Sequence, residues 1–174
     1  MENIPEGPCF LAPNHQSKLD AFLVLSYLNK RVLNDTFSYA KKDHVKGPVL
    51  KFLASRSNVI VMDLTKDLKY SIQKMAEVVK QGKKILIFPE GTRTKNGEMG
   101  DFKKTYAILS TELNIPVVPI AISGAYRAMS SGKKRIKIGE KITVEFLPAV
   151  YPENLKPEEL NEKVRDVISA AIID

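Results

Sequence analysis

Hydrophobic residues occur along this chain in two patterns, short apolar runs and longer segments with a helical period. The short runs predict strands at residues 8–12, 37–40, 59–62, 84–88 and 117–123. The longer segments predict helices at residues 18–30, 47–55, 67–81 and 103–113, and a last helix that begins at Pro157. Because strands alternate with helices, the chain is expected to form an α/β fold with a mainly parallel sheet flanked by helices.

Two of the predicted helices have the clearest apolar stripes. In the first, apolar residues recur at steps of four, three and four, at Leu68, Ile72, Met75 and Val79. Gly82 follows this helix as a C-terminal stop. Pro157 suits the first position of the last helix. The apolar stripe of that last helix consists of Leu160, Val164, Val167, Ile168 and Ala171.

Near the C-terminus the pattern changes to alternation. Residues 135–138 and 142–146 alternate polar and apolar side chains, and residues 139–141 separate the two segments. This pattern predicts an antiparallel hairpin at an edge of the sheet. The runs at residues 59–62 and 84–88 are instead continuous, which is typical of strands buried on both faces.

The length of 174 residues fits a single domain that spans residues 1–174. Lys and Arg number 27 and Asp and Glu number 20, so the formal charge is 27 − 20 = +7. This charge suits an anionic partner such as a phosphate headgroup, an acidic carrier protein or nucleic acid. Nucleic acid is disfavoured, because the basic clusters lack interleaved aromatic residues and no RRM, KH or helix-turn-helix pattern is present.

The basic residues gather at residues 41–46, 103–104 and 133–137. We expect at least one of these clusters to face anionic lipid or an acidic carrier. No apolar run approaches the roughly 18–20 residues that cross a bilayer, and no signal peptide precedes the first strand. The chain is therefore expected in the cytoplasm, or peripherally on the inner face of the cytoplasmic membrane.

Cys9 is the single cysteine of the chain. A disulfide framework is therefore excluded. Because no cationic residue lies near Cys9 in sequence, we interpret it as a buried, inert thiol rather than a nucleophile. His44, one of only two histidines, lies in a polar stretch and is interpreted as a surface residue.

The first candidate for chemistry follows the first predicted strand, at its carboxyl end, where ligands of parallel sheets bind. His15 and Asp20 are five residues apart, which on one helix would separate them by about 140° around the axis. They can meet if His15 lies in the loop and Asp20 in the first helical turn, with Ser17 as N-cap and Asp20 completing a capping box. Such a pair suits general base catalysis. The alternative is that Asp20 only caps the helix and His15 is a polar loop residue.

The second candidate follows the predicted strand at residues 84–88. Pro89 is expected to stop the strand, and Gly91 allows an unusual backbone angle. Arg93 comes just after them and suits bidentate phosphate binding. Glu90 can orient Arg93 or hydrogen-bond a hydroxyl of the acceptor substrate. The alternative is a polar turn with a surface ion pair.

These segments resemble three sequence blocks of the glycerolipid acyltransferases, the PlsC-like lysophosphatidic acid acyltransferase family. Residues 14–20 resemble its His-x4-Asp motif, residues 88–94 its Phe-Pro-Glu-Gly-Thr-Arg block, and residues 115–119 its late proline-containing block. The resemblance covers roughly residues 8 to 125, and the blocks occur in the family's order.

The resemblance implies an α/β fold and a transfer of a fatty acyl group to a hydroxyl of a lysophospholipid or glycerol-phosphate-type acceptor. His15 would be the general base and Asp20 the carboxylate that orients it. The acceptor would be bound by Glu90, Gly91, Thr92 and Arg93, with Arg93 on its phosphate. The acyl donor would be a thioester of coenzyme A or of acyl carrier protein, and no metal or other cofactor would be needed.

Two departures from the family pattern change this expectation. The family usually has an arginine where Leu64 stands, so Lys66 is the candidate for the missing phosphate contact, or a different headgroup is bound. Family members also often carry an apolar helical segment before the His motif, whereas 14 residues precede His15. We therefore expect a domain cut from a larger protein, with an acyl-activating ligase as one candidate for the rest. Apolar residues that follow the motif, such as Phe22 and Leu25, either line an acyl channel or pack in the core.

Two other functions remain open from the sequence. A His/Asp pair can activate water, so the chain is also compatible with a hydrolase of lipids or acyl thioesters. The leucine at position 64 is compatible with a catalytically impaired acyltransferase-like domain that only binds lipid. An assay with labelled acyl thioester and a set of lysolipids distinguishes all three.

Overall fold

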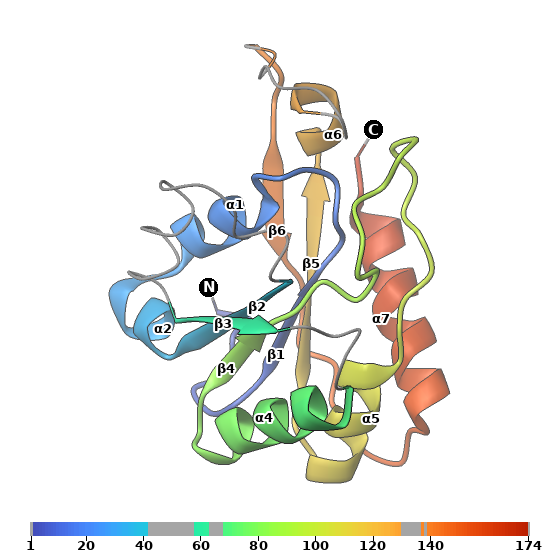
Figure 1. The fold of residues 1–174 in the computed structure, drawn as a ribbon. Coiled ribbons are helices and arrows are strands. Elements are labelled where there is room, and N and C mark those ends of the chain that lie inside the picture. The colour runs from blue at the N-terminus through green and yellow to red at the C-terminus, as the bar shows by residue number, and fades with distance from the viewer. Residues whose placement is uncertain (1, 42–57, 63–67, 130–136, 138, 174) are drawn as a thin grey trace.

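The computed structural model describes residues 2–41, 58–62, 68–129, 137 and 139–173. Within these residues, one sheet has the strand order β3-β2-β4-β1-β5-β6 (Figure 1). Its strands are β1 (Phe10–Pro13), β2 (Thr36–Lys41), β3 (Val59–Met62), β4 (Lys84–Leu86), β5 (Val117–Ser123) and β6 (Thr143–Phe146). All neighbouring strands run parallel except β5 and β6, which run antiparallel. The predicted α/β fold with a mainly parallel sheet is confirmed.

The helices cover both faces of this sheet. They are α1 (Asp20–Tyr27), α2 (Lys30–Asn34), α4 (Leu68–Lys80), α5 (Thr105–Leu113), α6 (Ala125–Ala128) and α7 (Pro157–Ala171). Figure 1 shows α1 and α2 on one side of the sheet and α4, α5 and α7 on the other. This layering follows from the strands, because side chains alternate between faces.

Adjacent residues of β1 show that alternation. Phe10 packs in the core beneath α4, α5 and α7, together with Met75 and Leu160. Leu11 packs in the opposite core, together with Val24 of α1. Every residue of β5 is buried. The central strands are therefore covered on both faces, as their continuous apolar runs predict.

The two predicted helical stripes are confirmed. Met75 and Val79 of α4 are fully buried, as are Leu160, Val164 and Ile168 of α7. Gly82 has a φ of +77°, the left-handed conformation expected of a residue that ends a helix.

Some element boundaries differ from the prediction. The helix expected at residues 18–30 is two helices, because Leu28 adopts an extended conformation and the Asn29 side chain accepts the N–H of Val32 as the N-cap of α2. The first strand begins at Phe10, and β4 ends at Leu86 rather than at residue 88. The helix expected at residues 47–55 lies outside the described residues, as do His44 and the basic residues at 42–46 and 133–135.

An antiparallel pair of strands is present near the C-terminus, and the hairpin expected between residues 135–138 and 142–146 lies partly outside the described residues. In the described residues β6 pairs with β5, which places Ile122 opposite Val144. Residues 135, 136 and 138 are outside the described part of the chain, and residue 137 belongs to no strand. Local alternation predicted the strand β6, and its described partner β5 precedes it in the chain. Similarly, β3 is the outermost of the described strands on its side, although its apolar run resembles that of a central strand.

Candidate active site

His15 lies in the loop between β1 and α1, at the carboxyl end of β1. Its Nδ1 lies 2.9 Å from Oδ2 of Asp20, the first residue of α1. With Asp20 ionised, a proton on Nδ1 satisfies this contact and leaves the lone pair of the ring on Nε2. The imidazole is 14% exposed and stacks on the Phe88 ring, with 4.1 Å between the ring centroids. The pair therefore has the arrangement that a general base requires.

Asp20 is completely buried, and hydrogen bonds surround its carboxylate. Oδ2 accepts the backbone N–H groups of Gln16 at 2.6 Å and Ser17 at 2.7 Å, and Oδ1 accepts the Ser17 hydroxyl. A buried carboxylate needs such partners, because an unpaired charge away from water is costly. These bonds hold the loop against the first turn of α1, so the orientation of His15 is set by the same group that contacts its ring.

The N-cap of α1 is Leu19, which has no side-chain cap hydrogen bond, so the predicted capping box with Ser17 as N-cap is wrong. The Ser17 hydroxyl oxygen accepts the N–H of Leu19 at 3.1 Å, while Asp20 accepts the N–H of Ser17. These bonds join the loop before α1 to its first turn without forming a capping box. Asp20 accepts N–H groups of the loop and contacts His15, so the alternative in which it only caps the helix is wrong.

Glu90 connects the second candidate segment to the first. Its Oε1 accepts the backbone N–H of His15 at 2.7 Å, and its Oε2 accepts the N–H of Gly100 at 2.9 Å. The N–H of Thr94 in turn donates to the backbone carbonyl of His15 at 2.9 Å. Both backbone polar groups of His15 are therefore held by the chain that follows β4.

The environment of Glu90 is also unusual. The residue is 7% exposed. Burial raises the pKa of its carboxyl above 4.5, although the hydrogen bonds from Gly100 and His15 act in the opposite direction. Each of its oxygens accepts a backbone N–H, and among the described residues Glu90 forms no hydrogen bond or ion pair with Arg93. The alternative of a surface ion pair is wrong, because Glu90 is buried.

The rest of the segment forms a turn that presents Arg93. Gly91 has a φ of +67°, and its N–H donates to the carbonyl of Phe88 at 3.0 Å. This confirms the unusual backbone angle expected there. Thr92 is exposed and Arg93 is partly buried. Among the described residues, the Arg93 side chain has no hydrogen bond or ion pair, so its guanidinium is available to an anion. Leu64 and Lys66 lie outside the described residues.

Three polar residues of the site were not singled out from the sequence. Asn14 forms two hydrogen bonds with the backbone of Ile122, at 3.0 Å and 2.7 Å, which tie the loop to β5. The Gln16 side-chain oxygen accepts the N–H of Tyr126 at 3.1 Å. Lys103 was assigned to a basic surface cluster, but its Nζ lies 2.8 Å from the position that a Cβ would take on Gly91. In the sequence, the only sign that these three residues belong to the site is their position inside or near the motif blocks.

Cys9 does not belong to this site. It is a free thiol, fully buried, and burial raises its pKa to about 12. This confirms the interpretation of an inert cysteine.

Among residues with a described placement, no group of three His, Cys, Asp or Glu side chains could hold a metal ion. None of the helices in the described part of the chain is long and apolar enough to span a membrane.

Comparison with known proteins identifies the family. The sequence model of the acyltransferase family matches residues 1–123. This stretch contains both candidate segments, residues 14–20 and 88–94. The chain belongs to the acyltransferase family. The expected resemblance to PlsC-like proteins is confirmed.

Individual relatives of this acyltransferase-family chain agree. A chloroplastic 1-acyl-sn-glycerol-3-phosphate acyltransferase from Brassica napus is 32% identical over 142 residues, which cover 78% of this chain and 39% of the relative. A 1-acyl-sn-glycerol-3-phosphate acyltransferase from Pseudomonas aeruginosa is 28% identical over 183 residues, which cover 100% of this chain and 67% of the relative.

A solved structure shows the same fold. The crystal structure of the 1-acyl-sn-glycerophosphate acyltransferase PlsC from Thermotoga maritima aligns with a TM-score of 0.79 and 27% identity, covering 97% of this chain and 67% of that one. The chain spans 39% of the Brassica relative, and 51% of a Cocos nucifera acyltransferase of the same name.

Proposed function

We propose that this chain transfers a fatty acyl group from a thioester to a free hydroxyl of a lysophospholipid or another glycerol-phosphate-type acceptor. The observation that carries the proposal is the contact between His15 and Asp20, 2.9 Å long and partly open to solvent on the imidazole side. The names of the relatives support the reaction class, because they are 1-acyl-sn-glycerol-3-phosphate acyltransferases.

The proposed reaction follows from the geometry of that pair. Nε2 of His15 takes the proton of the acceptor hydroxyl while its oxygen attacks the thioester carbonyl carbon. A C–O bond forms, the C–S bond breaks, and the thiolate leaving group receives the proton from the imidazolium. Asp20 stabilises the imidazolium during this sequence, because its buried negative charge lies beside Nδ1. No covalent acyl-enzyme is required.

Binding of the acceptor is proposed for the turn after β4. Arg93 would hold the acceptor phosphate as a bidentate partner, since its guanidinium has no other partner among the described residues. Gly91 and Thr92 would approach the acceptor beside it. The ammonium of Lys103 lies close to Gly91 and adds positive charge there. Lys66 remains a further candidate for a phosphate contact.

The donor is proposed to be an acyl thioester of coenzyme A or of acyl carrier protein.

We further propose that the chain acts peripherally on the inner face of the cytoplasmic membrane, with α1 toward the lipid. The large aromatic side chains of Phe22 and Tyr27 on α1 are 38% and 52% exposed. Apolar side chains of this kind insert at the lipid interface. Binding to anionic vesicles should fall when both are replaced by Ser, while Tyr151→Ser, equally exposed but on another part of the chain, serves as the control.

A transfer assay tests the proposed reaction directly. The purified chain is incubated with labelled acyl-coenzyme A or acyl carrier protein thioester and a panel of lysophospholipids. His15→Ala should lower the rate by about 10²–10⁴, the usual effect of removing a general base. Release of free fatty acid without an acceptor would identify a hydrolase instead. Lipid binding without turnover would identify an impaired, lipid-binding domain. A His15→Ala rate within a few fold of wild type would refute the mechanism.

A further inference from the structure

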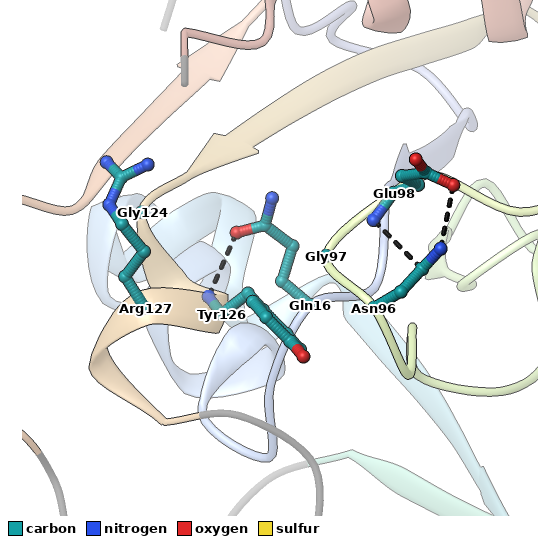
Figure 2. A pocket seen from close by; sticks show the side chains of 7 residues that line it. All are labelled: Gln16, Asn96, Gly97, Glu98, Gly124, Tyr126 and Arg127. Atoms are coloured by element: carbon teal, nitrogen blue, oxygen red, sulfur yellow. Dashed lines mark hydrogen bonds between the residues drawn. The ribbon is translucent and has the colours of Figure 1, made fainter.

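A polar cavity lies beside the loop that carries His15. It has a volume of about 240 Å³ and is lined by Gln16, Asn96, Gly97, Glu98, Gly124, Tyr126 and Arg127 (Figure 2). We call it the Gln16 cavity. Its volume lies just below the range typical of pockets for drug-sized ligands. It is therefore large enough for a polar headgroup but too small for an acyl chain.

Gln16 provides a donor with no partner. The residue is 5% exposed, and its Oε1 accepts the N–H of Tyr126 at 3.1 Å. That bond assigns the other end of the amide as the NH₂ group. Nε2 has no hydrogen bond among the described residues, and Figure 2 shows it on the side of the amide turned away from Tyr126. Because Gln16 lines the cavity, this nitrogen is a donor available to an acceptor there.

Arg127 supplies positive charge at the same cavity. Its Nε lies 3.4 Å from the Glu140 carboxylate, which leaves the two terminal nitrogens of the guanidinium available. One of them lies 3.4 Å from the position that a Cβ would take on Gly124. Figure 2 shows Glu98 on the opposite side of the cavity, with Gln16 between it and Arg127. The carboxylate of Glu98 accepts the side-chain N–H of Asn96 at 2.7 Å.

Two glycines keep the cavity open. Gly124 has a φ of +78°, and a Cβ there would lie 2.1 Å from the backbone oxygen of Lys141. Gly97 has a φ of +98°, and a Cβ there would lie 3.1 Å from the ring of Tyr126. Any side chain at either position would strain the backbone and move these neighbours. The walls of the cavity therefore depend on two positions that only glycine occupies without strain.

We propose that the Gln16 cavity binds a phosphate group of a substrate, through Nε2 of Gln16 and the guanidinium of Arg127. Both groups are hydrogen-bond donors, and the charge of Arg127 favours an anion. This proposal rests on the proposed acyl transfer. It is distinct from the Arg93 turn, since Arg93 does not line the cavity. Two substrate phosphates share the required chemistry, that of the phosphopantetheine arm of the donor and that of the acceptor headgroup.

Steady-state kinetics of two variants test the proposal and separate these sources. Gln16→Glu keeps an oxygen for the N–H of Tyr126 but replaces the donor with a negative charge. Arg127→Gln removes the positive charge. Each should raise the KM of one substrate about tenfold, the effect of losing one charge-assisted hydrogen bond, with kcat little changed. A rise confined to the acceptor identifies its headgroup phosphate, and a rise confined to the donor identifies the phosphopantetheine phosphate.

Glu98→Gln provides a change of opposite sign. Removing this negative charge should lower the same KM, by about twofold because exposed charges are screened. A purely structural effect of substitution would not produce opposite shifts at the two sides of the cavity. Lys163→Gln, which removes an exposed positive charge from α7 outside the cavity, is the matched control and should leave both KM values unchanged.

A binding measurement separates failure of this proposal from failure of the proposed reaction. Titration of the chain with inorganic phosphate should shift the side-chain amide ¹⁵N resonance of Gln16, and the shift should be lost in Arg127→Gln. If no acyl transfer is found but this shift occurs, the proposed reaction fails and the phosphate site stands. If the amide does not shift, or neither KM rises above that of Lys163→Gln, the cavity is not a phosphate site.

Discussion

The carboxylate of Glu90 accepts the backbone N–H of His15 at 2.7 Å, although the two residues are 75 positions apart. Its second oxygen accepts the N–H of Gly100. We therefore expect Glu90 to act on the proposed reaction through the position of His15. A residue that binds the acceptor changes the KM of the acceptor, whereas a residue that positions His15 changes kcat. Kinetics can therefore test this role.

Glu90→Gln should lower kcat and leave the KM of the acceptor nearly unchanged. The amide can accept only one of the two N–H groups, and its own NH₂ would face the other, so the His15 loop loses one restraint. We expect a decrease in kcat of about 10–100-fold, since small displacements of a catalytic group have effects of this size. Glu112→Gln, an exposed carboxylate on α5, is the control. A raised KM with unchanged kcat would instead assign Glu90 to the acceptor.

The raised pKa of Glu90 also predicts how stability depends on pH. The Glu90 carboxyl binds its proton more tightly in the folded protein than in the unfolded chain. In the unfolded chain the pKa of this carboxyl is near 4.5. The contribution of Glu90 is therefore most favourable below pH 4.5 and is lost as the pH rises through its folded pKa. Wild type should lose more stability than Glu90→Gln between pH 4.5 and neutrality in urea unfolding. Parallel pH profiles of the two proteins would contradict the assignment.

Asp20→Asn should impair both catalysis and folding. The amide cannot stabilise an imidazolium, so kcat is expected to fall by about 10²–10⁴. The substitution also leaves buried donors of the loop without an acceptor, which costs about 1–3 kcal/mol of the free energy of unfolding. His15→Ala separates the two effects, because it should remove activity while leaving urea unfolding close to wild type. An Asp20→Asn protein with full activity would disprove the pairing.

Cys9 should be unreactive in the folded protein. With a pKa of about 12, only about one thiol in 10⁴ is ionised at pH 8. A colourimetric thiol reagent should therefore label the native chain very slowly and label it completely in denaturant. Rapid stoichiometric labelling under native conditions would show that the thiol is accessible and would reopen a role for it.

Gly124→Ala should destabilise the protein more than Gly82→Ala. The two glycines have nearly equal φ angles, +78° and +77°, so the conformational strain is the same. They differ in surroundings, because a Cβ on Gly124 meets the backbone oxygen of Lys141 at 2.1 Å whereas nothing lies within 4 Å of one on Gly82. We expect about 1 kcal/mol for Gly82→Ala and clearly more for Gly124→Ala, measured by urea unfolding. Equal losses would mean that the Lys141 segment yields.

Much of the fold could be predicted from the sequence, because its signals are local. The apolar run of β5 and the stripes of α4 and α7 specify buried faces without reference to the rest of the chain. The features that local patterns did not predict depend on contacts with other parts of the chain. β6 was recognised by its alternation, but its pairing with β5 depends on which strand is adjacent in the sheet. The break at Asn29 was missed, since one capping side chain interrupts an otherwise apolar segment.

The sequence by itself determined which chemical groups are present and much of how each local segment folds: a loop that holds His15 beside Asp20, and a glycine turn that presents Arg93. Only the tertiary structure decided how these segments meet. β1 and β4 are parallel neighbours in the sheet, so their carboxyl ends lie side by side and bring Glu90 to the backbone of His15. The carboxylate of Glu90 is thereby buried against the loop that carries His15. Sequence spacing carries no record of that adjacency, because strand order is set by packing across the whole sheet.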